Sequence, residues 1–177
     1  MGKNVELKAR VRDLGEARKI AATMGARYVG LQEQVDTYFR VVQGRLKLRQ
    51  INGLQAELIW YERADQPQAR CSVYHRAPVA NPETLKTVLA AALGVETVVQ
   101  KRREIFLWEN VRIHLDHLSG LGSFLEFEAV VQSDQDESAA HTHLAQLVQK
   151  FHILPEDLLA RSYADLKGSS ELGCQKG

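Results

Sequence analysis

Apolar and polar residues alternate along most of this chain, the pattern of β-strands that bury one face. The first run lies between Asn4 and Val11, where every second residue is apolar and the residues between are Asn, Glu, Lys and Arg. Similar runs predict strands over residues 28–42, 45–51, 56–63, 70–76, 95–108, 111–118 and 124–131. Strands therefore make up much of the predicted structure.

Three segments instead follow the period of an α-helix. Asp13 is placed to cap a helix over 14–26, and Pro82 opens one that Gly94 ends. A third helix is predicted from 134 or 138 to about 151, with a final short turn or helix at Pro155. The pair Asn52-Gly53 between two strands is the strongest short hairpin signal in the chain.

Eight strands in hairpin order, with no crossover longer than one helix, indicate an antiparallel sheet that closes on itself. We therefore predict an α+β fold, an eight-stranded antiparallel β-barrel with helices packed outside. The length of 177 residues suits one domain, placed at residues 1–167. The Gly/Ser-containing segment 168–177 is predicted to be a flexible C-terminal tail.

Charged residues are sorted by strand, and this indicates what the barrel holds. Arg45, Lys47 and Arg49 share one face of their strand, whereas Glu126 and Glu128 share one face of the last strand. Faces that only meet water have no reason to separate cations from carboxylates in this way. A lumen lined by charges is costly unless a ligand, a metal ion and water fill it, so the pattern predicts a binding function.

Composition narrows the partners further. The 23 Lys and Arg residues nearly balance the 22 Asp and Glu residues, so no overall field recruits nucleic acid or an anionic membrane. No apolar run is long enough to span a bilayer and no signal-type segment begins the chain, so we expect a cytoplasmic protein. Cys71 and Cys174 lie far apart and are expected to be free thiols.

Hard carboxylate oxygens favour Mg²⁺ or Mn²⁺ as the metal. Zn²⁺ is disfavoured, because no Cys/His cluster has ligand spacing along the chain. His141 and His143 are two residues apart on a predicted helix and are expected to be surface residues. His114 is in phase with Asp116 and could face the lumen.

Five segments together resemble a known family. They are VELK at 5–8, DTYF at 36–39, GRLKLR at 44–49, IHLD at 113–116 and GLGSFLEFE at 120–128. From Asn4 to about Leu166 the chain resembles the CYTH superfamily, the triphosphate tunnel metalloenzymes that include class IV adenylyl cyclases and thiamine triphosphatases.

The resemblance implies a set of site residues in an eight-stranded tunnel. The metal would be held by Glu6, Glu126 and Glu128, with Asp116 close by. Phosphate groups would be bound by Lys8, Lys47, Arg49, Lys101 and Arg103. We expect Arg45 and Arg76 to bind the substrate as well. Within these sets, Lys8, Arg103 and Asp116 are predicted to take part in catalysis, with Mg²⁺ or Mn²⁺ as cofactor.

Two positions depart from the family pattern. The signature Glu-x-Glu-x-Lys has Asn4 in place of its first Glu, which removes one negative charge from the metal site. The family also tends to carry a Lys on the fourth strand. Arg63 is one residue out of phase with it, and Arg76 on the next strand is a possible substitute.

The resemblance implies an enzyme acting on a triphosphate-containing small molecule, with ATP converted to cyclic AMP and pyrophosphate. An alternative is hydrolysis of thiamine triphosphate or inorganic triphosphate. A third reading, favoured by Asn4, is a non-catalytic module that binds polyphosphate or nucleotide. An RNA-binding barrel fits the cationic strands but not the net charge of +1.

Overall fold

The computed structural model describes residues 1–173, apart from the side chains of residues 134, 135 and 169–173. Its elements follow the chain as β1 (Gly2–Val11), α1 (Leu14–Thr23), β2 (Arg27–Phe39), β3 (Arg45–Ile51), β4 (Gln55–Arg63), β5 (Arg70–Pro78), α2 (Pro82–Leu93), β6 (Val95–Trp108), β7 (Val111–Leu118), β8 (Gly122–Val131), α3 (Asp134–Lys150), the 3₁₀ turn η1 (Pro155–Asp157) and α4 (Tyr163–Gly173).

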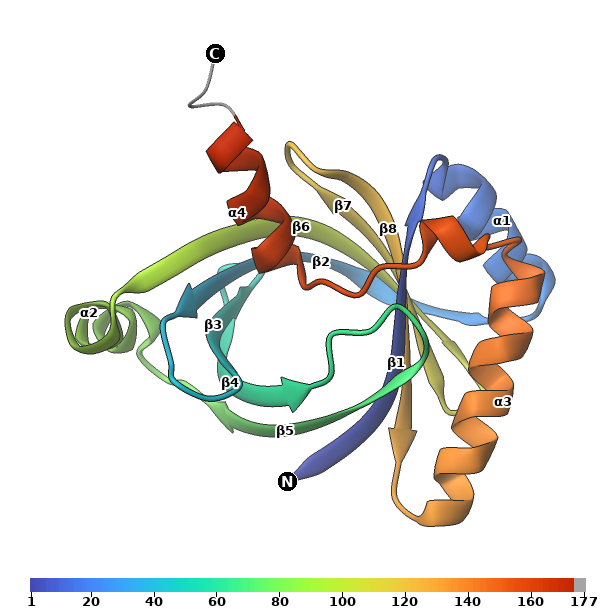
Figure 1. Ribbon diagram of the computed structural model, residues 1–177, viewed down its shortest axis with the longest axis horizontal. Coiled ribbons are helices and arrows are strands. Elements are labelled where there is room, and N and C mark those ends of the chain that lie inside the picture. Colours follow the sequence, from blue (N-terminus) through green and yellow to red (C-terminus); the bar gives the residue numbers. More distant parts are fainter. Residues whose placement is uncertain (174–177) are drawn as a thin grey trace.

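The eight strands form one closed barrel in the order β1-β5-β4-β3-β2-β6-β7-β8 (Figure 1). Every neighbouring pair is antiparallel, including the closing pairs of β1 with β5 and with β8. Each strand is therefore hydrogen-bonded on both sides, and no open edge is left. This confirms the predicted α+β fold with an eight-stranded antiparallel barrel.

Most boundaries follow local sequence signals. The β3–β4 hairpin turns at Asn52 and Gly53, with φ values of 53° and 67°, as the Asn-Gly pair predicts. β2 ends at Phe39, three residues before its predicted end, because the next amide, Arg40 N–H, bonds to Gly94 O outside the sheet. α1 likewise ends at Thr23 instead of near 26.

The apolar core lies outside the barrel wall, between strands and helices. Val5 and Leu7 of β1 are buried with Ala17 of α1 and Leu144 of α3, while α2 packs over a separate apolar patch. Figure 1 shows α1 and α3 beside β1 on one side and α2 at the opposite side. Since the outward faces carry the core, the inward faces are free to carry charge.

The sequence did not predict α4, which lies at one end of the barrel beside β6 (Figure 1). Its first residue, Tyr163, is buried, and its ring centroid lies 5.1 Å from that of Phe124. The helix continues through 168–173, part of the expected tail. Residues 174–177 lie outside the described residues, where the flexible tail stays a prediction.

Among the described helices, none combines the length and the apolar character needed to cross a membrane.

Candidate functional site

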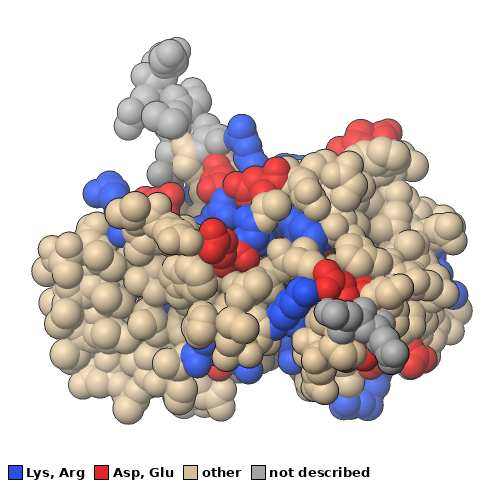
Figure 2. Space-filling model, turned by 60° about the horizontal axis from the view of Figure 1, so that its bottom comes forward, with Lys and Arg blue, Asp and Glu red and all other residues tan. Residues whose placement is uncertain are grey.

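The inward side chains of the strands line a cavity of about 400 Å³. Its basic lining residues are Lys8, Lys47, Arg49, Arg63, Arg76, Lys101, Arg103 and Arg112, and its acidic ones are Glu6, Glu57, Glu126 and Glu128. In Figure 2, basic and acidic side chains also gather next to one another in the middle of one face of the molecule. The cavity, which we call the tunnel, therefore mixes both signs of charge.

One wall of the tunnel gathers three cations around a single carboxylate. Asp36 of β2 accepts hydrogen bonds from Arg49 Nε and Nη2, both 2.7 Å long, and from Lys47 Nζ at 3.0 Å. Lys101 Nζ lies 3.6 Å from the same carboxylate. Burial by itself would raise the pKa of Asp36, but Arg49 and the two lysines hold it well below its usual value. This wall therefore carries excess positive charge.

The two lysines of this wall both have lowered pKa values. Burial, helped by the charge of Arg49, lowers the pKa of Lys47 to about 8. Burial and the neighbouring arginines also lower the pKa of Lys101 well below its usual value. A buried cation destabilised in this way gains from a nearby anion, so this wall is suited to bind one.

A second wall is organised by Arg103 of β6. Its Nε and Nη2 donate to the two oxygens of Asp116 at 2.7 and 2.6 Å, and Nη2 also donates to Glu126 at 2.8 Å. Lys8 Nζ lies 3.5 Å from Glu126 and 3.7 Å from the centre of the Tyr163 ring. Charge-assisted bidentate pairs of this kind fix the guanidinium in place.

Asp116 lies close to Glu126 but is shielded from the tunnel. It is fully buried, it does not line the tunnel, and it accepts a further hydrogen bond from Tyr163 Oη at 2.8 Å. Burial would raise its pKa, yet Arg103 and Lys101 lower that pKa to about 2, so the group stays ionised. The structure therefore places Asp116 behind Arg103, where it orients the guanidinium.

Glu6 of β1 faces a third group of charges. Its Oε1 lies 3.1 Å from Arg63 Nε and 3.4 Å from Arg70 Nε. Burial and the charge of Glu126 raise the pKa of Glu6. Arg63, although one residue out of phase with the family's Lys, lines the tunnel, because alternate β4 residues from 55 to 63 face it and bring Arg63 to Glu6. Arg70 does not line the tunnel, but its contact with Glu6 was not predicted from the sequence.

Asn4 and Glu128 complete the lining on β1 and β8. The amide Nδ2 of Asn4 donates to Glu128, whose carboxylate also lies 3.4 Å from Arg112. Asn4 Oδ1 is buried and has no hydrogen-bond partner within the described part of the chain. His114 lines the tunnel, and burial and Arg103 lower its pKa well below its usual value.

These oxygens fit a hard divalent cation. Glu6, Glu126 and Glu128 supply carboxylate oxygens, and the unpaired Oδ1 of Asn4 supplies a neutral carbonyl ligand. In the structure each carboxylate is directed to basic side chains, and among the described residues these three carboxylates do not all lie within 4.8 Å of one another. The donor chemistry therefore suits Mg²⁺ or Mn²⁺.

Two predicted substrate-binding residues lie at the edges of the site. Arg45 does not line the tunnel, and its Nη2 lies 2.8 Å from Asp65 and 3.2 Å from Asp165 of α4. Arg76 lines the tunnel, but its side chain is 52% exposed and pairs with Glu57 at 3.8 Å. The remaining predicted cations, Lys8, Lys47, Arg49, Lys101 and Arg103, all lie in the tunnel.

The sequence of this chain is similar to sequences of known proteins. The family model of the CYTH domain matches residues 2–163. A protein of Methanocaldococcus jannaschii, named "Putative adenylate cyclase MJ0240", is 21% identical over 174 residues, which is 93% of this chain and 98% of the relative.

Solved structures share the fold. The PH1012 protein of Pyrococcus horikoshii OT3 has a TM-score of 0.82 and 25% identity, over 92% of this chain and 98% of that one. A protein of Hippeastrum, "Putative adenylyl cyclase HpAC1", is described as having a dominant triphosphatase activity. Its TM-score is 0.59 at 12% identity, over 86% of this chain and 89% of that one.

Proposed function

The chain belongs to the CYTH domain family, and we propose that it is a metal-dependent enzyme that converts ATP to cyclic AMP and pyrophosphate in its tunnel. Proteins of this family typically process triphosphates, usually with a metal ion, and the domain implies binding of a triphosphate ligand. The finer choice of ATP cyclisation draws support from the Methanocaldococcus relative, whose name is "Putative adenylate cyclase MJ0240".

The observation that carries the proposal is the wall around Asp36, where three cations face one carboxylate. A triphosphate supplies the missing negative charge and spans several cations at once. In a buried site such interactions are stronger than in water, and the phosphate charge would also stabilise the protonated forms of Lys47 and Lys101. A single phosphate carries less negative charge and offers fewer oxygens to these groups.

The residues divide by role in this proposal. Lys47, Arg49 and Lys101 bind phosphate oxygens, while Lys8 and Arg103 neutralise the negative charge that develops as the phosphoryl group is transferred. Glu6, Glu126 and Glu128, with Asn4, would hold Mg²⁺ or Mn²⁺, which supplies Lewis-acid polarisation of the phosphate oxygens. Asp116 and Tyr163 keep Arg103 and Lys8 in position.

The cyclisation itself needs a nucleophile held in line. The ribose 3′-hydroxyl oxygen forms a bond to the α-phosphorus, the bond to the pyrophosphate leaving group breaks, and the hydroxyl proton passes to water. Positioning decides this outcome, because the same cradle would let water attack instead.

Triphosphate hydrolysis is the second candidate. It is favoured by the Hippeastrum protein, which shares the fold and is described as having a dominant triphosphatase activity. Thiamine triphosphate and inorganic triphosphate would use the same basic wall, with water as nucleophile.

A non-catalytic sensor of polyphosphate or nucleotide is the third candidate, and Asn4 is the observation that favours it. Its amide replaces a carboxylate and donates to Glu128, so the metal site holds one negative charge fewer.

The test is incubation of the purified protein with ATP and Mn²⁺, followed by chromatographic separation of all products. Cyclic AMP with equimolar pyrophosphate supports the cyclase, whereas ADP or free phosphate from any triphosphate supports the hydrolase. The matched control is Arg102→Ala, since Arg102 precedes Arg103 but is 61% exposed on the outer face. This variant should keep wild-type activity.

A binding arm accompanies the activity assay. Tripolyphosphate with Mg²⁺ should raise the melting temperature far more than phosphate with Mg²⁺, because the longer anion carries more charge and contacts more of the cations that line the tunnel. Binding of tripolyphosphate without formation of any product would support the non-catalytic sensor. Equal shifts from both anions, together with no product, would contradict all three candidates.

A further inference from the structure

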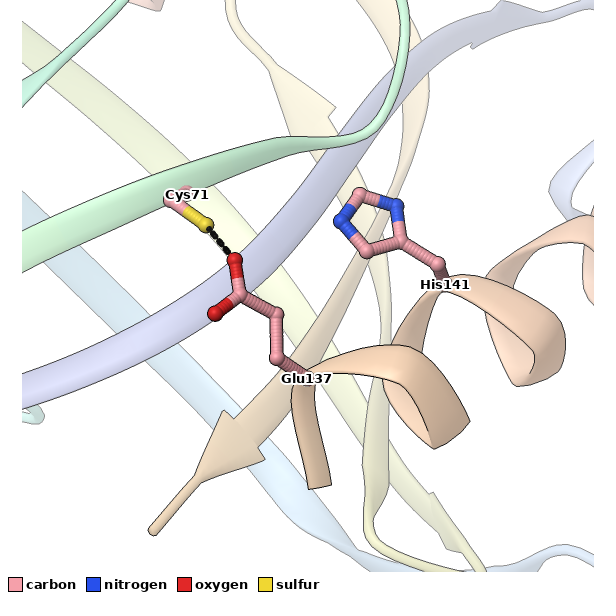
Figure 3. A group of neighbouring side chains, drawn as sticks. All are labelled: Cys71, Glu137 and His141. Carbon is pink, nitrogen blue, oxygen red and sulfur yellow. Dashed lines mark hydrogen bonds between the residues drawn. The ribbon is translucent and has the colours of Figure 1, made fainter. Parts of the chain in front are cut away.

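A second polar cluster lies outside the barrel wall, away from the tunnel. Cys71 projects from β5 toward Glu137 and His141 of α3 (Figure 3). One sulfur, one carboxylate oxygen and one ring nitrogen of these residues lie within 4.8 Å of one another. Within the described residues, no other group of three such ligand side chains meets this distance. We call these three residues the outer-wall cluster.

The backbone explains why the three side chains meet. Along β5, Ser72 lines the tunnel, so its neighbour Cys71 faces outward. Glu137 and His141 are four residues apart on α3 and therefore share one face of the helix. Figure 3 shows both side chains reaching from that face toward the strand.

The donors are already partly oriented for a ligand. Cys71 Sγ donates to Glu137 Oε1 at 2.6 Å, while Lys3 Nζ donates to the other oxygen, Oε2, also at 2.6 Å. Lys3 thus fixes the carboxylate and leaves Oε1 directed at the sulfur. A residue that hydrogen-bonds to a metal ligand in this way typically orients the ligand and tunes the affinity of the site for metal.

The protonation states of Glu137 and Cys71 also suit a metal site. Hydrogen bonds from Cys71 and Lys3 lower the pKa of Glu137, so its carboxylate is ionised near neutral pH. Burial and the neighbouring Glu137 raise the pKa of the Cys71 thiol, so the sulfur keeps its proton when no metal is bound. A metal ion would displace that proton.

We propose that Cys71, Glu137 and His141 bind one zinc-class transition metal ion, with a further position left to water. Thiolate, imidazole and carboxylate together are the donor set that Zn²⁺ takes in proteins, and they differ from the all-oxygen donors of the tunnel. As the sulfur–metal bond forms, the S–H bond breaks and the proton passes to solvent. The ion would fasten the beginning of α3 to β5.

Cobalt provides the sharpest test, because thiolate–Co²⁺ bonds give a charge-transfer absorption that oxygen ligands do not. No cysteine is found among the described residues that line the tunnel, so Co²⁺ bound there is silent in this band. The full chain is freed of metal with a chelator, supplied with excess Mg²⁺ and titrated with Co²⁺. The absorption band should then develop and saturate at one Co²⁺ per chain. Cys71→Ser should lose the band.

Cys174→Ser is the matched control, since it removes the other thiol of the sequence. It should keep the band. A band that persists in Cys71→Ser, a band lost in Cys174→Ser, or no band at all in the wild-type protein would each overturn the proposal.

Competition titration with Zn²⁺ gives a second measurement that does not rely on sulfur. His141→Ala should weaken zinc binding by about 100-fold or more, because loss of even a supporting partner costs roughly 10–100-fold. Since His141 is exposed, this variant should fold even if Cys71→Ser does not. His117→Ala, an exposed histidine on β7, should bind as the wild type does. Equal affinity in all three proteins would contradict the site.

Discussion

The tunnel and the outer-wall cluster lie on opposite faces of the same strands. On β1, Lys3 points outward to Glu137 whereas Asn4 lines the tunnel. On β5, Cys71 points outward whereas Ser72 lines the tunnel. The tunnel is lined by carboxylates and cations from many strands. The outer-wall cluster instead consists of a thiol, an imidazole and a carboxylate from one strand and one helix.

The two regions differ in what supports them. Each tunnel charge is held by charges from other strands of a closed barrel, so removing one member leaves others buried and uncompensated. The outer-wall cluster is partly exposed and rests on few hydrogen bonds, so water can replace a lost partner. Comparable substitutions should therefore have large effects inside and small effects outside.

The largest effect is expected from Arg103→Met compared with Arg102→Met. Loss of Arg103 leaves the buried carboxylate of Asp116 without its bidentate partner, at a cost of about 3–5 kcal/mol in the free energy of unfolding. Arg102 is exposed, so its loss should change this free energy by less than about 0.5 kcal/mol. Urea denaturation measures both. Equal losses would break the contrast between the two faces of β6.

The next largest effect is expected on catalysis. Glu126→Gln keeps the shape of the side chain but removes a charge that faces Lys8 and Arg103, so kcat/KM should fall by about 100- to 1000-fold and metal dependence should weaken. Glu104→Gln, which removes the partner of Arg18 on the outer face, is the control and should be nearly neutral. Wild-type kinetics in Glu126→Gln would show that the site is wrongly assigned.

A smaller, pH-dependent effect should come from Lys47. Because its pKa is about 8, the free protein loses this positive charge as pH rises through that value, and kcat/KM for a triphosphate should fall about tenfold per further pH unit. Lys47→Arg stays charged, so its falling limb should move to higher pH. An unchanged limb in this variant would exclude Lys47 as its source.

The same shift has a consequence for stability with the opposite sign. The pKa of Lys47 lies below its usual 10.5, so between about pH 8 and 10.5 the unfolded chain binds more protons than the folded protein. The contribution of Lys47 to the free energy of unfolding of the ligand-free protein therefore rises with pH over this window.

The smallest effect is expected from Cys71→Ser. Without transition metal, with Mg²⁺ present, turnover should stay within about twofold of wild type and stability should change by less than about 1 kcal/mol, because the thiol is partly exposed. Steady-state kinetics and urea denaturation of the chelator-treated protein check this. A loss of activity as large as that of Glu126→Gln would mean that the two regions are coupled.

Sequence alone determined the barrel and most of its lining. Side chains on a strand alternate with a period of two, so charges at 6 and 8, 47 and 49, 101 and 103, or 126 and 128 reveal the inward face without knowledge of the partner strands. Turn residues such as Asn52 and Gly53 then set the hairpin order.

Other features depend on contacts between elements that are distant in sequence. Asp116 shares the inward phase of β7, but only packing shows that Arg103 and Tyr163 enclose it. The sequence set Arg63 one residue out of phase with the family's Lys, and only the strand pairs around β4 show that it lines the tunnel. α4 has no clear apolar stripe, so its position comes from burial of Tyr163 at the barrel end.

The outer-wall cluster is the clearest case of what only the tertiary structure decided. The i, i+4 spacing of Glu137 and His141 is visible in the sequence, but Cys71 lies 66 residues before Glu137, and no local pattern links them. Strand alternation predicts that Cys71 faces outward, yet which helix covers it depends on how α3 packs on β1, β7 and β8. Local periodicity determines a side chain's face, whereas packing determines its neighbours.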